Sequence, residues 1–367
     1  MAISVKKALA KYGSPAIDAA YLDMKISQFE AMPASQQSKY SGFVTPEGTI
    51  HVDHPLTDFS LKYQNAELIG DLVMPRIPVV KDTDIYFAYG REEFALNNDV
   101  RANGAKGNEV RSLSVTTELP YRCLTHQLQD YFTEIDVQNA DQPLNIELDK
   151  TENLTKMLGI NREYRVSTLY SSVSNWSTVD PTNSAHIGGV TLSGAQQMNN
   201  AAYDNSTPTG NIEYLIDNGK QAILNAIGRD PNVIIIPRTV ARVIKRDSYV
   251  RNLLRYTDAT LVENGELPER LWNMDVFEPA AIYASNEAGQ TFSSAGLWGN
   301  NIILLYLAEN PRQIKTMTAG LTFMAQPRIV NKWHDFSIRG DQIECLERIV
   351  EKQISAYCGY VIADVIG

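Results

Sequence analysis

Two alternating stretches separated by a long polar segment constrain the fold of this chain most strongly. Residues 85–89 read IYFAY and residues 110–119 read VRSLSVTTEL, and both alternate in the manner of β-strands. The intervening FALNNDVRANGAKGNE is polar and carries Gly104 and Gly107 near its middle. Together these patterns predict a β-hairpin over residues 83–122 with a long polar tip.

A hairpin of this length has no core of its own and is only marginally stable in water, so something else must support it. From Ile85 to Arg122 it carries five acidic and five basic residues, a mixture that suits docking on another copy of the chain. A solvated hairpin lying back on its own domain remains the alternative. The candidate intersubunit contacts are Arg91, Glu92, Glu93, Arg101, Lys106, Glu109 and Arg111.

The segment before the hairpin divides into two parts. Residues 1–64 are broken by several prolines and contain the polar run ASQQSKYSG, which indicates an extended arm that is ordered only by lying on something else. A disordered tail fits that composition equally well. Residues 65–82 read as a connector, in which a short helix over AELIGDLVM ends at Pro75 and an extended segment follows.

Apolar periodicity predicts a mixed α+β chain beyond the hairpin. A long helix is expected over about 144–174, and an apolar stripe over 212–227, ended by Gly228, predicts a second helix. PNVIIIP predicts a short buried strand. Further elements are expected as helices at 239–245 and 249–256, strands at 276–284 and 302–307, and the strand-like runs LTFMAQ, RIVNKWHDFSIR and QIECLERIVEKQISAYCGYVIADVI.

Motifs that carry chemistry are missing from the sequence. It contains no GxGxxG, no GxxxxGK[ST], no GxSxG and no HExxH, so no catalytic, cofactor-binding or metal-binding residues are predicted. The cluster HVDHP has ligand types suited to a metal but lies in the proline-broken arm, where a solvated turn is the better interpretation. Trp298 in GLWGNN fits a turn leading into a strand better than a ligand-stacking residue. Cys123, Cys345 and Cys358 are expected to be buried free thiols.

Charge and hydropathy exclude several classes of protein. The formal net charge is −10 and no block of basic residues occurs, which argues against dedicated nucleic-acid binding, because such binding relies on neutralising phosphates. No apolar run is long enough to span a membrane, and the N-terminus lacks the pattern of a signal peptide, so we expect synthesis in the cytoplasm.

Three segments, in the same order, resemble the major capsid proteins of tailed bacteriophages. They are NAELIGDLVMPRIPVVKDTDIYFAYGREEF, GRDPNVIIIPRTVARVIKRDSYVRNLLRYT and GLWGNNIILLYLAENP. The resemblance covers most of the chain from about Asn65 onwards and implies the Hong Kong 97-type fold. Carried over to this sequence, it implies the following parts: an N-terminal arm (1–64), a connector (65–82), an extended-loop hairpin (83–122), a peripheral domain with a long spine helix (123–209), an axial α/β domain (210–315), and C-terminal strands that return to the peripheral domain (316–367).

The resemblance also implies a function and partners. The chain is expected to assemble with copies of itself into hexamers and pentamers of an icosahedral or prolate shell that encloses double-stranded DNA without binding it specifically. Scaffolding, portal and decoration proteins are expected further partners, and the expected location is the virion capsid, assembled in the bacterial cytoplasm. The alternatives are another virion component, such as a decoration, sheath or tail protein, and an enzyme whose site the motifs do not reveal.

Overall fold

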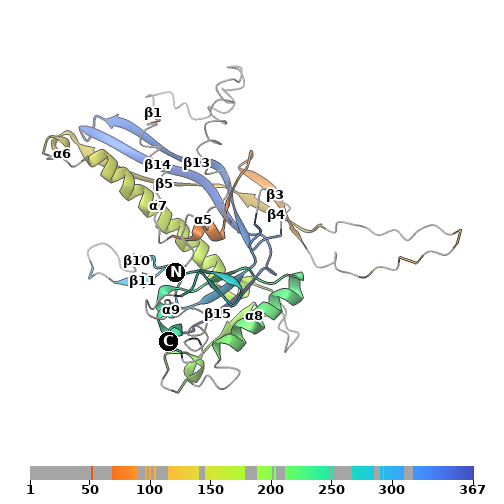
Figure 1. The fold of residues 1–367 in the computed structure, drawn as a ribbon. Coiled ribbons are helices and arrows are strands. Elements are labelled where there is room, and N and C mark those ends of the chain that lie inside the picture. Colours follow the sequence, from red (N-terminus) through yellow and green to blue (C-terminus); the bar gives the residue numbers. More distant parts are fainter. Residues whose placement is uncertain are drawn as a thin grey trace.

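Two large β-sheets and one long helix organise the described part of the chain (Figure 1). The computed structural model describes residues 51–52, 68–89, 96, 99–100, 103–104, 115–139, 145–177, 188–200, 202–203, 211–247, 250, 267–284, 290–291, 293–309 and 317–367. Within these residues helices and strands are mixed along the chain, as the sequence predicted.

The larger strands form a five-stranded sheet. β13 (Gly320–Asp335) and β14 (Gly340–Gln353) are antiparallel, and β5 (Leu124–Thr133) pairs with the other side of β14. The remaining edge of β13 is shared by β1 (His51–Val52) and the parallel strand β2 (Arg76–Pro78). The expected runs LTFMAQ and RIVNKWHDFSIR thus lie in one strand as far as Asp335, and the register of this strand shifts between Met324 and Ile329, around Pro327. Proline cannot donate to a ladder, so an irregularity at this point keeps the strand continuous.

One face of this sheet is covered by α7 (Ile146–Ser171), the long helix expected at about 144–174 (Figure 1). Its first turn is capped by Asn145, whose side chain accepts a hydrogen bond from the Leu148 N–H at 3.4 Å. Helix and sheet bury an apolar cluster of Phe132, Leu154, Leu158, Val330, Ile343 and Cys345. The short helix α6 (Glu134–Asn139) lies between β5 and α7 in the chain.

A six-stranded sheet forms the second lobe. Its strands lie in the order β6 (Gly189–Thr191), β15 (Gly359–Ala363), β12 (Ile302–Leu305), β7 (Val233–Ile235), β9 (Met274–Phe277) and β8 (Arg270–Leu271). Two predicted helices belong to this lobe, α8 (Ile212–Ile227) and α9 (Arg238–Ile244). α8 ends at Gly228 in a left-handed conformation with φ 68°, which confirms the predicted stop. Two 3-10 turns, at Val173–Asn175 and Gly194–Gln196, complete the connections.

Two expectations are corrected in this lobe. The strand expected at 276–284 is interrupted at Pro279, after which β10 (Ile282–Ala284) leaves the sheet and pairs with β11 (Ser294–Gly296). The last expected run is also divided, because a turn separates β14 from β15, and β15 pairs with β12 and β6. Residues 316–367 therefore do not all return to the five-stranded sheet. The helix expected at 249–256 lies outside the described residues, apart from Val250.

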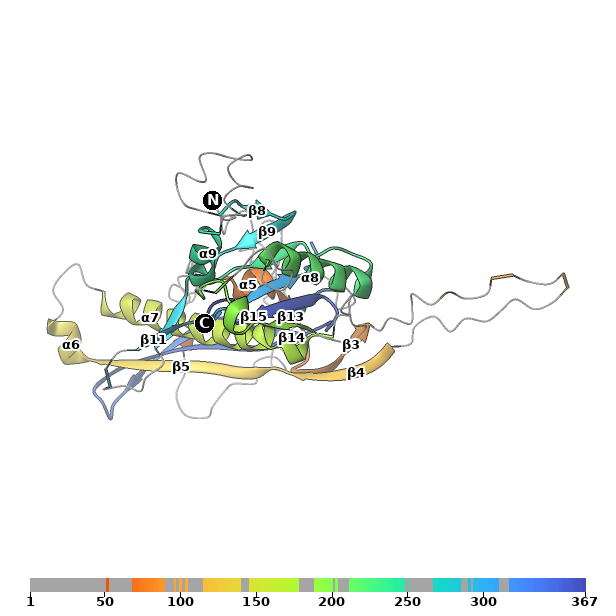
Figure 2. The same ribbon diagram turned by 90° about the horizontal axis from the view of Figure 1, so that it is seen from below.

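The predicted hairpin is confirmed where the structure describes it. β3 (Thr83–Tyr89) pairs antiparallel with β4 (Val115–Arg122), from Thr83 opposite Arg122 to Tyr89 opposite Val115. β4 then continues through Cys123 into β5, so the two strands form one long ribbon along a border of the molecule (Figure 2). Ahead of the hairpin, the described part of the expected connector helix contains α5 (Gly70–Val73). In the part of the chain that the structure describes, no helix is both long and apolar enough to cross a membrane.

Candidate functional site: the base of the hairpin

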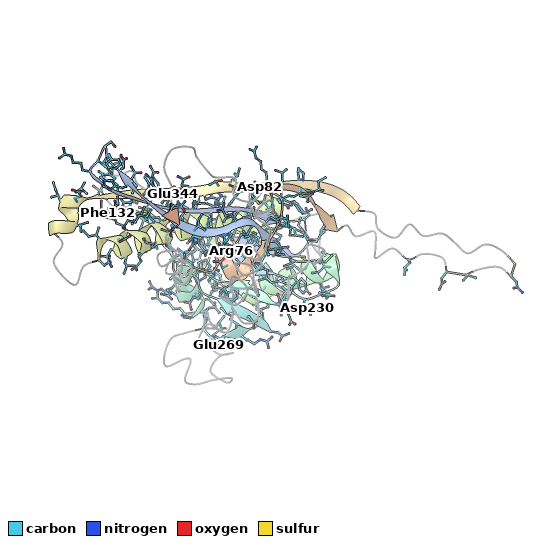
Figure 3. All side chains as sticks on the ribbon, turned by 90° about the horizontal axis from the view of Figure 1, so that it is seen from above. Arg76, Asp82, Phe132, Asp230, Glu269 and Glu344 are labelled. Atoms are coloured by element: carbon cyan, nitrogen blue, oxygen red, sulfur yellow. The ribbon has the colours of Figure 1, made fainter. Side chains whose placement is uncertain are left out.

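The short strand β2 places consecutive side chains on opposite faces of the five-stranded sheet. Arg76 lies opposite Thr322 and Ile77 lies opposite Phe323 in the parallel pairing with β13. Arg76 therefore points to the face that α7 covers, and Ile77 to the other face. Figure 3 shows Arg76 near the middle of the molecule, with Asp82 toward the hairpin and Phe132 toward the far end of the sheet. The connector is held from both sides of the sheet at this point.

On the Ile77 face, aromatic side chains fasten the hairpin to the sheet. The ring of Tyr121 stacks on Phe323 with centroids 4.4 Å apart, and Tyr86 lies tilted against Phe323 at 5.6 Å. Phe323 is fully buried, and these rings belong to a cluster with Ile77, Cys123, Leu321 and Ile354. Aromatic pairs at such distances stabilise beyond the burial of their area. The base of the hairpin thus has the support that its two strands lack by themselves.

This cluster shows which of the two alternating sides of β3 is buried. Tyr86 is 5% exposed, whereas its neighbour Ile85 is 46% exposed. Across the hairpin, the Tyr121 hydroxyl donates to the carbonyl oxygen of Lys81 at 3.3 Å, and Arg348 of β14 donates to Asp82 at 2.9 Å. The alternative of a hairpin lying on its own domain therefore describes the base of the hairpin correctly.

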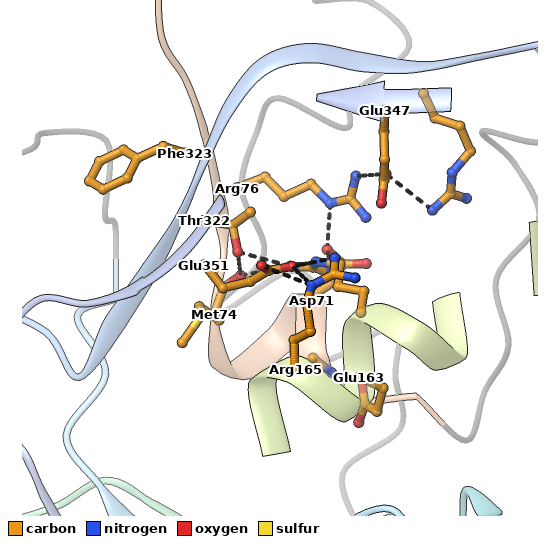
Figure 4. Close-up of polar contacts among 12 residues, drawn as sticks. Asp71, Met74, Arg76, Glu163, Arg165, Thr322, Phe323, Glu347 and Glu351 are labelled. Carbon is orange, nitrogen blue, oxygen red and sulfur yellow. Dashed lines mark hydrogen bonds and ion pairs between the residues drawn. The ribbon is translucent and has the colours of Figure 1, made fainter. Parts of the chain in front are cut away.

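On the opposite face, a group of charged side chains joins the connector, α7 and the sheet (Figure 4). We call it the charge cluster. Its positive members are Arg76, Arg162, Arg165 and Arg328, and its negative members are Asp71, Glu163, Glu347 and Glu351. Each of the four arginines pairs with Asp71, Glu347 or Glu351, and such pairing is the condition under which charges are tolerated away from water.

Arg162 is the member of the cluster with the most contacts to other elements. It pairs with Asp71 of α5, donates to the carbonyl oxygen of Met74 at 3.1 Å and donates to the hydroxyl of Thr322 at 3.1 Å. Arg165, one turn of α7 further on, makes a two-pronged contact with Glu351 of β14, at 2.8 and 3.2 Å to Oε1. These contacts hold α7, the connector and the sheet in one arrangement.

The arginines govern the ionisation of the two acids beside them. Burial would raise the pKa of Asp71, but the positive charges of Arg162 and then Arg76 outweigh it and hold that pKa well below its ordinary range. Burial likewise opposes ionisation of Glu347, whose side chain is fully buried, yet Arg76 and Arg328 lower its pKa to about 2. Arg76 donates to Glu347 at 2.9 Å and to Asp71 at 2.7 Å, so it links the two carboxylates.

Glu163 occupies a different position from the other acids, between the connector and the second lobe. Its carboxylate accepts hydrogen bonds from the backbone N–H groups of Ile69 and Gly70, at 3.0 and 2.6 Å, and so caps the start of α5. It also accepts a hydrogen bond from the indole of Trp298 at 2.7 Å. Burial raises the pKa of Glu163, against the opposing effect of these donors.

Gly70 is required by this arrangement. A Cβ atom at Gly70 would lie 2.5 Å from Oε2 of Glu163, closer than any real contact. The glycine lets the backbone approach the carboxylate directly.

The structure describes only some of the residues that the sequence singled out. The candidate contacts Arg91, Glu92, Glu93, Arg101, Lys106, Glu109 and Arg111 all lie outside the described residues. Of the HVDHP cluster, the structure describes only the backbone of His51 and Val52, in β1. Trp298 lies in the turn between β11 and β12 and is 2% exposed. Its side chain is therefore part of the core. All three cysteines are free and buried, as expected.

The charge cluster and the aromatic cluster were not predicted. Their partners are far apart in sequence, as with Arg76 and Glu347, which are separated by 271 residues. A usable signal was the run of charges in the C-terminal strands, where Glu347 and Glu351 interrupt an otherwise apolar alternation. Among the described residues, no group of histidine, cysteine and acidic side chains is arranged to hold a metal ion.

Comparison of the sequence with known proteins identifies two relatives. The major capsid protein of Burkholderia phage BcepMu is 26% identical over 261 residues, which cover 70% of this chain and 76% of that protein. The major capsid protein of Pseudomonas phage JBD67 is 26% identical over 314 residues, covering 83% of this chain and 94% of that protein. No family model matches the chain.

Solved structures share the fold. A phage-related protein from Bordetella bronchiseptica RB50 superposes with a TM-score of 0.63 at 20% identity, covering 87% of this chain and 98% of that one. The capsid of cyanophage P-SCSP1u gives a TM-score of 0.54 at 11% identity, covering 88% and 91%. The mature capsid of bacteriophage PhiM1 gives 0.51 at 11% identity, covering 86% and 90%. The comparisons confirm the resemblance to phage major capsid proteins and an α+β capsid fold of the Hong Kong 97 type.

Proposed function

We propose that this relative of phage major capsid proteins assembles into hexamers and pentamers of an icosahedral or prolate shell that encloses double-stranded DNA. The observation that carries the proposal is the similarity in sequence to two major capsid proteins over 70% and 83% of the chain. The names of these relatives support a structural role and a location in the virion capsid, which we propose is assembled in the cytoplasm of the host bacterium.

The parts of the fold take roles in this proposal. The hairpin (83–122) is the extended loop, α7 is the spine helix, and the five-stranded sheet is the peripheral domain. The six-stranded sheet, including β15 and β6, belongs to the axial domain, and residues 1–64 form the arm. In this proposal the aromatic and charge clusters fix the direction in which the hairpin leaves the subunit, because they hold its base on both faces of one sheet.

The candidate contacts in the hairpin are proposed to meet a neighbouring subunit. Opposite charges are equal in number between Ile85 and Arg122, so the hairpin suits a partner surface that also carries both signs. The net charge of −10 suits a shell that contains DNA without binding it tightly. Scaffolding, portal and decoration proteins are proposed as further partners.

The abundance of the protein in purified particles tests this function. A major capsid subunit is expected to dominate the protein of the particle, whereas a decoration, sheath or tail protein leaves another chain as the main shell component. Quantitative mass spectrometry of purified particles distinguishes the two. A minor share for this chain in particles with intact shells would contradict the proposal.

A further inference from the structure

The free edge of β5 carries a short window of unpaired backbone groups. β5 is the last strand of the five-stranded sheet, and its pairing with β14 runs without interruption from Leu124 to Thr133. In a regular antiparallel pair, the N–H and C=O groups of alternate residues point toward the partner and away from it. Half of the backbone groups of β5 therefore point to the free edge.

Three hydrogen bonds show which residues these are. The N–H of Tyr131 is bonded to its neighbour Asp130 at 2.8 Å, and the N–H of Thr133 to Asp136 at 2.9 Å, so neither faces β14. At the other end, the N–H of Cys123 is bonded to the carbonyl of Asp82 at 2.8 Å. Odd-numbered residues thus point outward.

The outward residues between these closed ends are Thr125, Gln127 and Gln129. Each is exposed, and within the described part of the chain their backbone groups have no hydrogen-bond partner across the free edge. We call residues 125–129 the edge window. It offers three N–H and three C=O groups to a strand of about five residues.

The edge window lacks the devices that usually protect an edge strand. Proteins guard such edges with charged side chains, prolines or bulges. Residues 124–129 read LTHQLQ, with no Lys, Arg, Asp, Glu or Pro, and the register with β14 has no bulge. By contrast, the outward N–H of Tyr131 is already bonded to the side chain of Asp130. In β3, the N–H of Ile85 is likewise bonded to the side chain of Asp84, at 2.9 Å.

We propose that the edge window pairs with a short, uncharged, extended segment from a second copy of this chain. The absence of charge in the window selects an uncharged partner strand, since an unpaired charge beside it would lose hydration without compensation. The partner is a second copy because, under the proposed function, copies of this chain are its most abundant neighbours. A whole β5 strand of the neighbour does not fit, since Asp82 occupies the position next to Cys123. The inference rests on the proposed function.

Amide hydrogen exchange in assembled shells tests this directly. The amides of Thr125, Gln127 and Gln129 are expected to exchange rapidly in free subunits and at least about tenfold more slowly in shells made from this chain alone. Equal, rapid exchange in both states would overturn the inference while leaving the shell function intact. Protection that appears only after a different phage protein is added would overturn the second copy as the partner. Failure to form shells under all assembly conditions, with or without the other phage head proteins, would overturn the proposed function and this inference together.

A proline substitution gives an independent test. Gln127→Pro removes only the outward N–H, which the sheet itself does not use, so the unfolding midpoint is expected to stay close to that of Gln127→Ala. Assembly is expected to be lost in Gln127→Pro and kept in Gln127→Ala, as measured by sedimentation. Equal assembly of the two variants would contradict the proposal. If Gln127→Pro does not fold, the exchange measurement decides by itself.

Discussion

The indole nitrogen of Trp298 donates a hydrogen bond to Oε1 of Glu163 at 2.7 Å, across 135 residues of sequence. The same carboxylate caps the start of α5 through Ile69 and Gly70. One side chain of α7 therefore joins the connector, the long helix and the turn that begins β12. This contact adds to the apolar core that Val73 of α5 and Val166 of α7 share with the second lobe.

The Trp298 contact predicts an unequal cost for two tryptophan substitutions. Trp298→Phe removes a donor to a buried carboxylate, and we expect it to lower the free energy of unfolding by about 2–3 kcal/mol. Trp176→Phe is the matched control, because Trp176 is also 2% exposed but donates to a neutral carbonyl, that of Tyr170 at 3.0 Å. Its expected cost from the lost hydrogen bond is about 1 kcal/mol. Urea unfolding measures both variants, and equal costs would contradict the role given to Glu163.

The charge cluster predicts a loss of stability in acid. The pKa of Glu347 in the folded chain is about 2, below its ordinary value of 4.5, so its contribution is complete above pH 4.5 and is lost as the pH falls toward 2. The shift corresponds to about 3 kcal/mol. Glu347→Gln should therefore flatten the decline of unfolding free energy between about pH 5 and pH 2.

The control for this measurement is Glu344→Gln. Glu344 lies in the same strand, but burial raises its pKa, so it contributes no acid-labile stability of this sign. The steep acid decline is expected to persist in this variant. Unfolding curves at a series of pH values compare the two variants with the unsubstituted chain. A decline that is unchanged in Glu347→Gln would show that the cluster does not govern acid stability.

The aromatic cluster predicts a strong effect of Phe323. Phe323→Ala removes the fully buried ring on which Tyr86 and Tyr121 pack, and we expect a loss of about 3–5 kcal/mol in unfolding free energy. Ile85→Ala, on the exposed side of β3, should cost less than about 1 kcal/mol. Chemical denaturation measures the difference. Similar costs for the two would mean that the hairpin base does not depend on this cluster.

The candidate contacts predict separate effects on folding and assembly. Reversing the charge of Arg91 together with Arg101 is expected to impair assembly strongly while leaving the unfolding midpoint of the subunit nearly unchanged. The double reversal of Arg238 and Arg242, both exposed on α9, changes the net charge equally and serves as the control. Sedimentation and thermal unfolding report the two properties. Equal loss of folding and assembly would favour a hairpin that serves only its own domain.

The helices and strands that follow from local hydrophobic periodicity were predictable from the sequence. The stripe from Ile212 to Ile227 and its stop at Gly228 need only a period of 3.6 residues and one residue free to adopt positive φ. The long helix and the hairpin strands were found in the same way. Alternation also showed that Ile85 and Tyr86 face opposite sides, but it contains no information on which side meets Phe323.

Contacts between distant segments were not predictable in this way. The pairing of Arg162 with Asp71 and of Arg76 with Glu347 depends on how α7 and β2 meet β14, which local periodicity does not contain. The prediction that β15 returns to the five-stranded sheet was wrong for a related reason. Its run of apolar residues suits any buried strand, and only the turn after β14 directs it to the six-stranded sheet.

Electron microscopy of the purified, expressed chain shows directly whether the protein assembles into a shell. We expect capsomers or closed shells, formed by the chain alone or with the other phage head proteins present. A stable monomer under all assembly conditions, with or without those proteins, would contradict it.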